Sequence, residues 1–189
     1  MYRELDYTAL EQFLQTQSDE TKIYIGGDSE RILKSGVWHA DYTTVVVVHI
    51  DGCRGCRIFG ELVRERVYDQ QKDRPTMRLM TEVQKISELY LRIEPLLNRF
   101  HTEIHLDLNP KKIHASNHVV QQAIGYIKGT CNIEPQIKPT AWAASYCADR
   151  LKEIWEHQKS PPNAHNIRSN KHSNQYKVKA KKTKKRQAA

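Results

Sequence analysis

The stretch VWHADYTTVVVVHI (residues 37–50) carries the strongest β signal in the chain, because β-branched and aromatic residues fill it almost without interruption. The turn residues DGCRG (51–55) follow it and would fold the chain back onto a second strand at residues 56–67. Before it, KIYIGGD (22–28) is a short β-rich run that two glycines and an acid bring to a halt. Three consecutive strands joined by short turns predict an antiparallel meander.

The pattern then changes to helices that alternate with strands. Apolar residues at helical spacing predict helices over residues 6–17, 76–97, 115–128 and 141–156. Gly129 is expected to end the third of these helices. The segment TEIHLDL (102–108) alternates as a strand, and residues 133–138 form a last short one.

This order predicts an α/β fold with one mixed five-stranded sheet flanked by helices. The crossovers after the meander should be right-handed, which makes the later strands parallel to the first and gives the strand order 3-2-1-4-5. The chain then reverses its direction of growth between the strands at 22–28 and 102–108. Ligands of open α/β sheets bind at such a switch point, beyond the carboxyl ends of the strands.

Four carboxylates are expected near that point. Asp28 and Asp107 end the two strands, Glu82 falls on the apolar stripe of its helix, and Asp149 lies on the edge of the last helix. Close carboxylates repel one another unless a cation neutralises them. Hard oxygen ligands suit Mg²⁺ or Mn²⁺, and a pair of such ions activates water in phosphodiester hydrolysis. We therefore predict that these four acids bind two Mg²⁺ or Mn²⁺ ions and carry the catalysis.

Each acid has a structural alternative. Asp28 and Asp107 could be turn residues after their strands. Glu82 could pair at the helix rim with Arg78 or Lys85, and Asp149 with Lys152. These alternatives remain open at the level of sequence.

Polar residues around the acids are candidates to line the path of a phosphate backbone, namely Ser29, Asn109 and Lys128. Trp142 and Tyr146 could stack on a base, but aromatic residues at helical spacing more often belong to a core. Cys53 and Cys56 form a C-x-x-C pair in the predicted hairpin turn. Free thiols are the favoured interpretation there, since a structural zinc ion needs four ligands.

The net charge of +8 is unevenly distributed. Residues 157–189 hold ten of the 30 Lys and Arg residues and none of the 22 Asp and Glu residues, so residues 1–156 carry a net charge of −2. We predict a folded domain over 1–156 and a basic, disordered tail over 157–189. Such tails attract nucleic-acid phosphates, and the expected contacts are Lys181, Lys182, Lys184, Lys185 and Arg186.

Five segments together resemble the ribonuclease H-like YkuK family: IYIGGDSE (23–30), RLMTEV (78–83), HLDLNP (105–110), AIGYIKGT (123–130) and IKPTAWAASYCADRL (137–151). The resemblance implies a ribonuclease H-like fold and a metal-dependent nuclease site. It makes Asp28, Glu82 and Asp107 the acids of the first strand, first helix and fourth strand, with Asp149 as the acid of the final helix. Thr140 stands before AWAAS, where relatives are expected to carry an acid.

The sequence thus predicts a nuclease that cleaves RNA, an RNA–DNA hybrid or structured DNA. A non-catalytic nucleic-acid-binding module of the same fold is the alternative, and a protein–protein adaptor is a third possibility. No apolar run approaches the roughly 20 residues that span a bilayer, and the N-terminus lacks a signal-peptide pattern, so we expect a cytoplasmic protein without membrane contact. Four cysteines in a chain of 189 residues do not form a disulfide framework, which fits that compartment.

Overall fold

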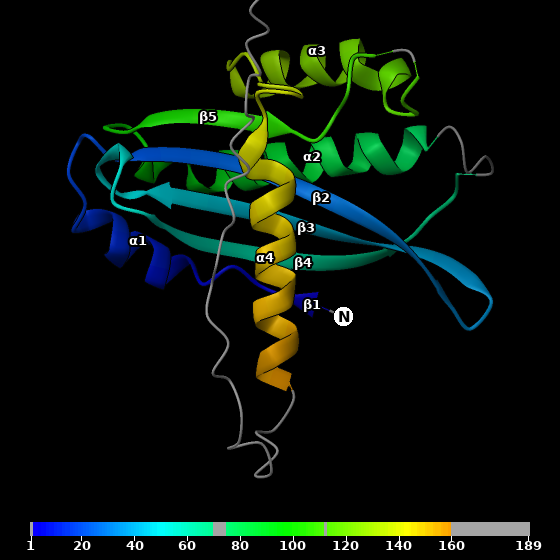
Figure 1. Ribbon diagram of the computed structural model, residues 1–189, viewed down its shortest axis with the longest axis horizontal. Coiled ribbons are helices and arrows are strands. Elements are labelled where there is room, and N and C mark those ends of the chain that lie inside the picture. Colours follow the sequence, from blue (N-terminus) through cyan, green and yellow to red (C-terminus); the bar gives the residue numbers. More distant parts are fainter. Residues whose placement is uncertain (1, 70–74, 112, 160–189) are drawn as a thin grey trace, which may run out of the picture.

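The computed structural model describes residues 2–69, 75–111 and 113–159. Strands β2 (Lys22–Lys34), β3 (Val37–His49) and β4 (Cys56–Arg66) form the predicted antiparallel meander. On the other side of β2, β5 (His101–Leu106) runs parallel to it, and β1 (Tyr2–Arg3) pairs with β4 at the far edge. The sheet order is β1-β4-β3-β2-β5, so the predicted mixed five-stranded sheet is confirmed (Figure 1).

Helices cover both faces of this sheet. Helix α4 (Trp142–Lys159) crosses one face, and α1 (Tyr7–Gln15), α2 (Thr76–Ile93) and α3 (Val120–Cys131) lie toward the other (Figure 1). Three 3-10 turns complete the described elements: η1 (Ile50–Gly52), η2 (Glu94–Leu96) and η3 (Asn117–Val119). None of the described helices combines the length and the apolar character that crossing a bilayer requires.

The apolar run in β3 serves both layers. Val46 and Val48 join the core beneath α1, α2 and α3, whereas Val45 and Val47 join the smaller core beneath α4. All four valines have no exposed surface. A strand buried on both faces needs apolar residues at every position, and this explains why the run does not alternate.

Helix α4 packs close to the sheet at Gly60 in β4. A Cβ atom at Gly60 would collide with the carbonyl oxygen of Thr44 and with the side chain of Leu151 on α4. Leu151 and Trp155 fill the space that the glycine leaves open. This contact fixes how far α4 stands from the sheet.

The structure differs from the prediction at residues 133–138 and at the end of the third helix. Residues 133–138 form only an isolated bridge, in which Gln136 pairs with His105. The ladder stops there because the carbonyl oxygen of Leu106 accepts from the Leu108 amide, so the Lys138 amide donates to Leu108 instead. The fifth strand of the sheet is instead β1. Helix α3 also continues past Gly129 to the buried Cys131, and the left-handed residue that ends it is Asn132 (φ 54°).

Strand β2 is longer than predicted. It continues beyond Asp28 to Lys34 and turns into β3 through Ser35 and Gly36, both with positive φ. Several side chains of this extension, Leu33 and Lys34 among them, are exposed, so it lacks the apolar pattern that marked the first half of the strand.

Candidate active site

Asp28 lies on β2, and Asp107 directly follows β5, the parallel neighbour of β2. In the pairing of β2 with β5, Gly27 lies opposite Leu106. The residue that follows each of them along the backbone is one of the two aspartates. Because paired strands lie about 4.8 Å apart, the two residues are close together, level with the carboxyl end of β5. Their side chains are partly buried, with exposed fractions of 27% and 16%.

Glu82 lies on the buried side of α2, with 3% of its surface exposed. Its Oε2 atom accepts a hydrogen bond of 2.5 Å from the hydroxyl of Ser29. The pKa of Glu82 is raised to about 8, mainly by burial and also by the charges of Asp28 and Asp107, while the hydrogen bond from Ser29 and the charge of Arg78 oppose the rise. Burial is thus the main reason why the ionised form of Glu82 is disfavoured here.

Arg78 holds Ser29 in place from the same helix. One of its guanidinium nitrogens donates to both the carbonyl oxygen and the hydroxyl oxygen of Ser29, each at 2.5 Å. Arg78 lies one helical turn before Glu82. A short chain of hydrogen bonds therefore runs from α2 to β2 and back to the Glu82 carboxyl.

A lysine neutralises each of the two aspartates. The Nζ atom of Lys152 on α4 lies 2.7 Å from Asp28 Oδ2, and Lys138 forms an ion pair with Asp107. Burial works against the charge of Lys152, but its hydrogen bond to Asp28 and the nearby acids raise its pKa overall. Both aspartates therefore already hold a cation that the protein supplies.

Three of the four predicted acids influence one another directly. Asp28 and Asp107 both act on the charge of Glu82, whereas Asp149 reaches the group only through Lys152, whose Nζ lies 3.5 Å from Asp149 Oδ1. Asp149 itself is exposed. Among the described residues, no group of three or more His, Cys, Asp or Glu side chains is arranged so that it could hold a metal ion.

The residues predicted to contact phosphate lie in different surroundings. Ser29 is buried and engaged with Glu82, and Asn109 follows β5, where its side-chain oxygen accepts from the Lys111 amide at 3.0 Å. Lys128, near the end of α3, pairs with Glu134 at 2.5 Å. The expected tail contacts from Lys181 to Arg186 lie outside the described residues.

The four cysteines are free, and Cys53 and Cys56 are exposed. This agrees with the interpretation of the C-x-x-C pair as free thiols. The other two, Cys131 and Cys147, are buried, and burial raises the pKa of each thiol to about 11.

Sequence reasoning did not assign Lys138 and Lys152 to the two strand-end aspartates. Lys152 had a signal only as a partner of Asp149, three residues earlier on the same helix. Lys138 precedes Pro139 across a cis peptide bond and had no signal at all. Both assignments depend on contacts between segments that lie far apart in the sequence.

The comparison with protein families agrees with this architecture. A family model described as Ribonuclease H-like matches residues 7–153, which span the four predicted acids and both lysines. No curated protein and no solved structure matches the chain.

Proposed function

Because the chain belongs to the ribonuclease H-like family, we propose that it is a nuclease that hydrolyses phosphodiester bonds of RNA, an RNA–DNA hybrid or structured DNA with Mg²⁺ or Mn²⁺. The observation that carries the proposal is the buried Glu82 carboxyl, set against Asp28 on β2 and Asp107 directly after β5. A buried acid with a strongly raised pKa beside two further acids is more typical of a functional site than of residues that only stabilise a fold.

The chemistry of the donor set fits a hard divalent cation. All three side chains offer carboxylate oxygens, and a cation bound beside the buried Glu82 would favour its ionised form. Asp28, Glu82 and Asp107 would hold the ion or ions, with Asp149 as a further acid on α4. A bound ion of this kind supplies an activated water and stabilises the leaving oxygen of a phosphodiester.

The protein's own lysines have a separate task. Lys152 and Lys138 pair with Asp28 and Asp107 and fix the direction in which each carboxylate points. Ser29, held by Arg78, orients the Glu82 carboxyl through a hydrogen bond. The acids are therefore held in place by hydrogen bonds from β2, α2, α4 and the segment before α4.

The test is cleavage of labelled RNA, RNA–DNA hybrid and DNA junctions by the purified full chain with Mn²⁺. Asp28→Asn and Asp107→Asn each keep the size of the side chain and should lower the rate at least about 100-fold, since each removes a metal ligand. Asp19→Asn is the matched control, because Asp19 is an exposed partner of Arg99 at the surface. Unchanged cleavage in both site variants, with normal thermal unfolding, contradicts the proposed metal mechanism.

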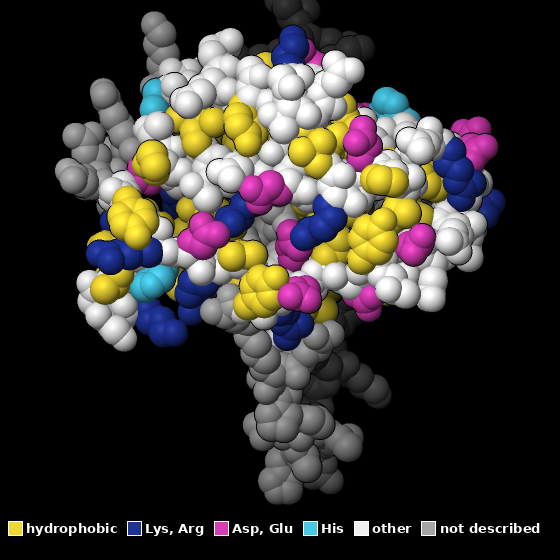
Figure 2. Space-filling view, turned by 180° about the vertical axis from the view of Figure 1, so that it is seen from behind, with side chains coloured by type: hydrophobic (Ala, Val, Ile, Leu, Met, Phe, Trp, Pro, Cys, Tyr) yellow, Lys and Arg dark blue, Asp and Glu magenta, His cyan; other side chains and the backbone are white. Residues whose placement is uncertain are grey.

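One observation favours a second candidate, a nucleic-acid-binding module without catalysis. Both strand-end aspartates carry lysine partners, and no three-acid metal group is preformed among the described residues. On the face shown in Figure 2, acidic and basic side chains are mixed, so this face has no continuous basic surface for a nucleic acid. Affinity would then come from the basic residues 157–189.

The two candidates differ in what the acids do for binding. A binding module retains its affinity for RNA or DNA in Asp28→Asn, whereas removal of residues 160–189 weakens binding and flattens its dependence on salt. A stable protein partner that survives nuclease treatment would favour an adaptor instead. We place either activity in the cytoplasm, and four free cysteines support a reducing compartment.

A further inference from the structure

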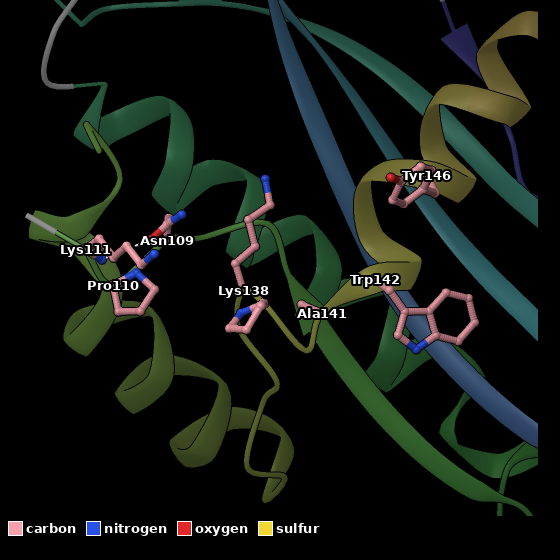
Figure 3. Close-up of a pocket in the computed structure, with 8 residues that line it drawn as sticks. Asn109, Pro110, Lys111, Lys138, Ala141, Trp142 and Tyr146 are labelled. Atoms are coloured by element: carbon pink, nitrogen blue, oxygen red, sulfur yellow. Dashed lines mark hydrogen bonds between the residues drawn. The ribbon is translucent and has the colours of Figure 1, made fainter. Parts of the chain in front are cut away.

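A pocket of about 340 Å³ opens beside Asp107, between the segment that follows β5 and the start of α4 (Figure 3). Asn109, Pro110 and Lys111 form one wall, and Trp142 and Tyr146 form the other. Lys138, Pro139 and Ala141 lie between them. In Figure 3 the Lys138 side chain rises between the two walls, with its Nζ at the tip. The volume is within the range of small-molecule sites, about 300 to 1,000 Å³.

The lining combines apolar surface with two positive charges. Neither Asp nor Glu is among the lining residues. The ammonium of Lys111 forms no ion pair with a carboxylate of the described residues, whereas that of Lys138 pairs with Asp107. A ligand suited to this lining carries an anionic group for the lysines and a flat apolar group for the walls.

The aromatic wall consists of Trp142, which contacts the core, and Tyr146, which is mostly exposed. Trp142 packs edge-on against the buried Tyr24, with ring centres 4.9 Å apart, and near His105 at 6.0 Å, yet 44% of it is exposed. Tyr146, one helical turn further along α4, is 78% exposed. A tyrosine this exposed at the mouth of a pocket adds little to the core and offers its ring to a ligand.

The position of the pocket relates it to the acids. Lys138 lines the pocket and at the same time contacts Asp107. Asp107 in turn lies next to Asp28 in the register of β5 and β2. An anionic group bound at Lys138 would therefore lie next to any ligand bound at Asp107 and Asp28.

We propose that this pocket binds one nucleotide unit of a single strand, with its base against Tyr146 and Trp142 and its phosphate at Lys111 and Lys138. The inference rests on the proposed function and deepens it, because it names single-stranded nucleic acid as the substrate class. A base in this pocket must leave its own stack, and a protein ring then replaces the neighbour that it loses. A base inside a duplex remains stacked on its neighbours and cannot make that contact.

The test measures binding without cleavage. The full chain is titrated in EDTA against a fluorescein-labelled single-stranded RNA of eight nucleotides and against an abasic strand of the same length. Tyr146→Ala should weaken binding of the base-containing strand about 5- to 150-fold and leave the abasic strand unaffected, since one base–ring stack is worth roughly 1 to 3 kcal/mol. Tyr126→Ala is the matched control, because Tyr126 is 38% exposed on α3 and does not line the pocket.

A second variant tests the phosphate contact. Lys111→Ala should weaken both strands and lower the slope of log affinity against log salt by about one. Three results overturn the proposal. Tyr146→Ala weakens binding of both strands equally, it does not weaken binding at all, or a duplex binds with the same dependence on Tyr146. Because EDTA removes the metal, a chain that binds as expected but cleaves nothing contradicts only the nuclease, and a chain that cleaves without Tyr146 dependence contradicts only the pocket.

Discussion

The ammonium of Lys152 lies 2.7 Å from Asp28 Oδ2, although the two residues are 124 positions apart in the sequence. The same ammonium lies 3.5 Å from Asp149 Oδ1. Lys152 therefore links α4 to Asp28, the residue of the candidate site that lies on β2. Lys152 is 17% exposed, which makes this a largely desolvated ion pair. An ammonium and a divalent cation at Asp28 would compete for the same carboxylate oxygens.

That competition predicts the behaviour of Lys152→Met. In EDTA the variant should lose about 1 to 3 kcal/mol of unfolding free energy, because Asp28 keeps its charge without a partner. Added Mn²⁺ should then raise the melting temperature of the variant more than that of the parent chain. Thermal unfolding with and without Mn²⁺ measures both effects.

Lys85→Met is the matched control for this experiment. Lys85 is 16% exposed and pairs with Glu65 at 2.5 Å, away from the two strand-end aspartates. It should respond to Mn²⁺ as the parent does. A Mn²⁺ shift that is the same in all three proteins would show that no cation binds at Asp28.

The raised pKa of Glu82 predicts that the unfolding free energy of the protein depends on pH. Its pKa in the folded state, about 8, lies above the ordinary value of 4.5, so the native state holds a proton that the unfolded state has lost between these values. The unfolding free energy should therefore fall as the pH rises from 4.5 to 8. Glu82→Gln removes this fall, so relative to the parent it gains up to about 1.4 kcal/mol per pH unit in that window.

Urea unfolding in EDTA at pH 5, 6, 7 and 8 measures this gain. Glu88→Gln, an exposed position on the same helix, is the control and should follow the parent at every pH. If the difference between Glu82→Gln and the parent stays constant across the series, the carboxyl group does not titrate in the expected range.

The sequence predicted the layers of the fold better than its edges. The meander, β5 and α2 follow from apolar periodicity alone, because burial on one or two faces dictates that pattern. The strand at 133–138 failed because the chain turns after β5, where the Leu106 carbonyl accepts from the Leu108 amide and the ladder beside Gln136 stops. The edge strand β1 has only two residues, too few to show any period.

The candidate site was predictable to the same degree. Asp107 is placed by the end of its strand, and Glu82 by its position on an apolar stripe, so local rules were sufficient for these two. Asp28 lies beside Asp107 as expected, but β2 does not end there and continues to Lys34. Lys152 and Lys138 were not predictable, because their contacts depend on how α4 and the segment before it dock on the sheet. The charge balance of the site is thus a tertiary property.

Ser29→Ala tests the support that Glu82 receives. The substitution removes the 2.5 Å hydrogen bond to the buried carboxyl and should cost about 1 to 3 kcal/mol of unfolding free energy. The loss should be larger at pH 8 than at pH 5, because the hydroxyl stabilises the charged form of Glu82. Ser87→Ala is the control, since Ser87 is equally buried but donates to the carbonyl of Gln84, and its cost should not change with pH.

Gly60→Ala tests whether the close approach of α4 is required. The new methyl group meets the Thr44 carbonyl and Leu151, so the helix or the strand must move, and we expect a loss of about 1 to 3 kcal/mol. Gly125→Ala is the matched control, because Gly125 is exposed on α3 with no atom within 4 Å of an added Cβ. That change should stabilise the protein by about 0.5 to 1 kcal/mol through helix propensity. Since α4 also carries Lys152, Gly60→Ala should weaken the contact with Asp28 and reduce Mn²⁺-dependent cleavage, and a variant that unfolds early yet cleaves at the parent rate would separate the docking of α4 from the site.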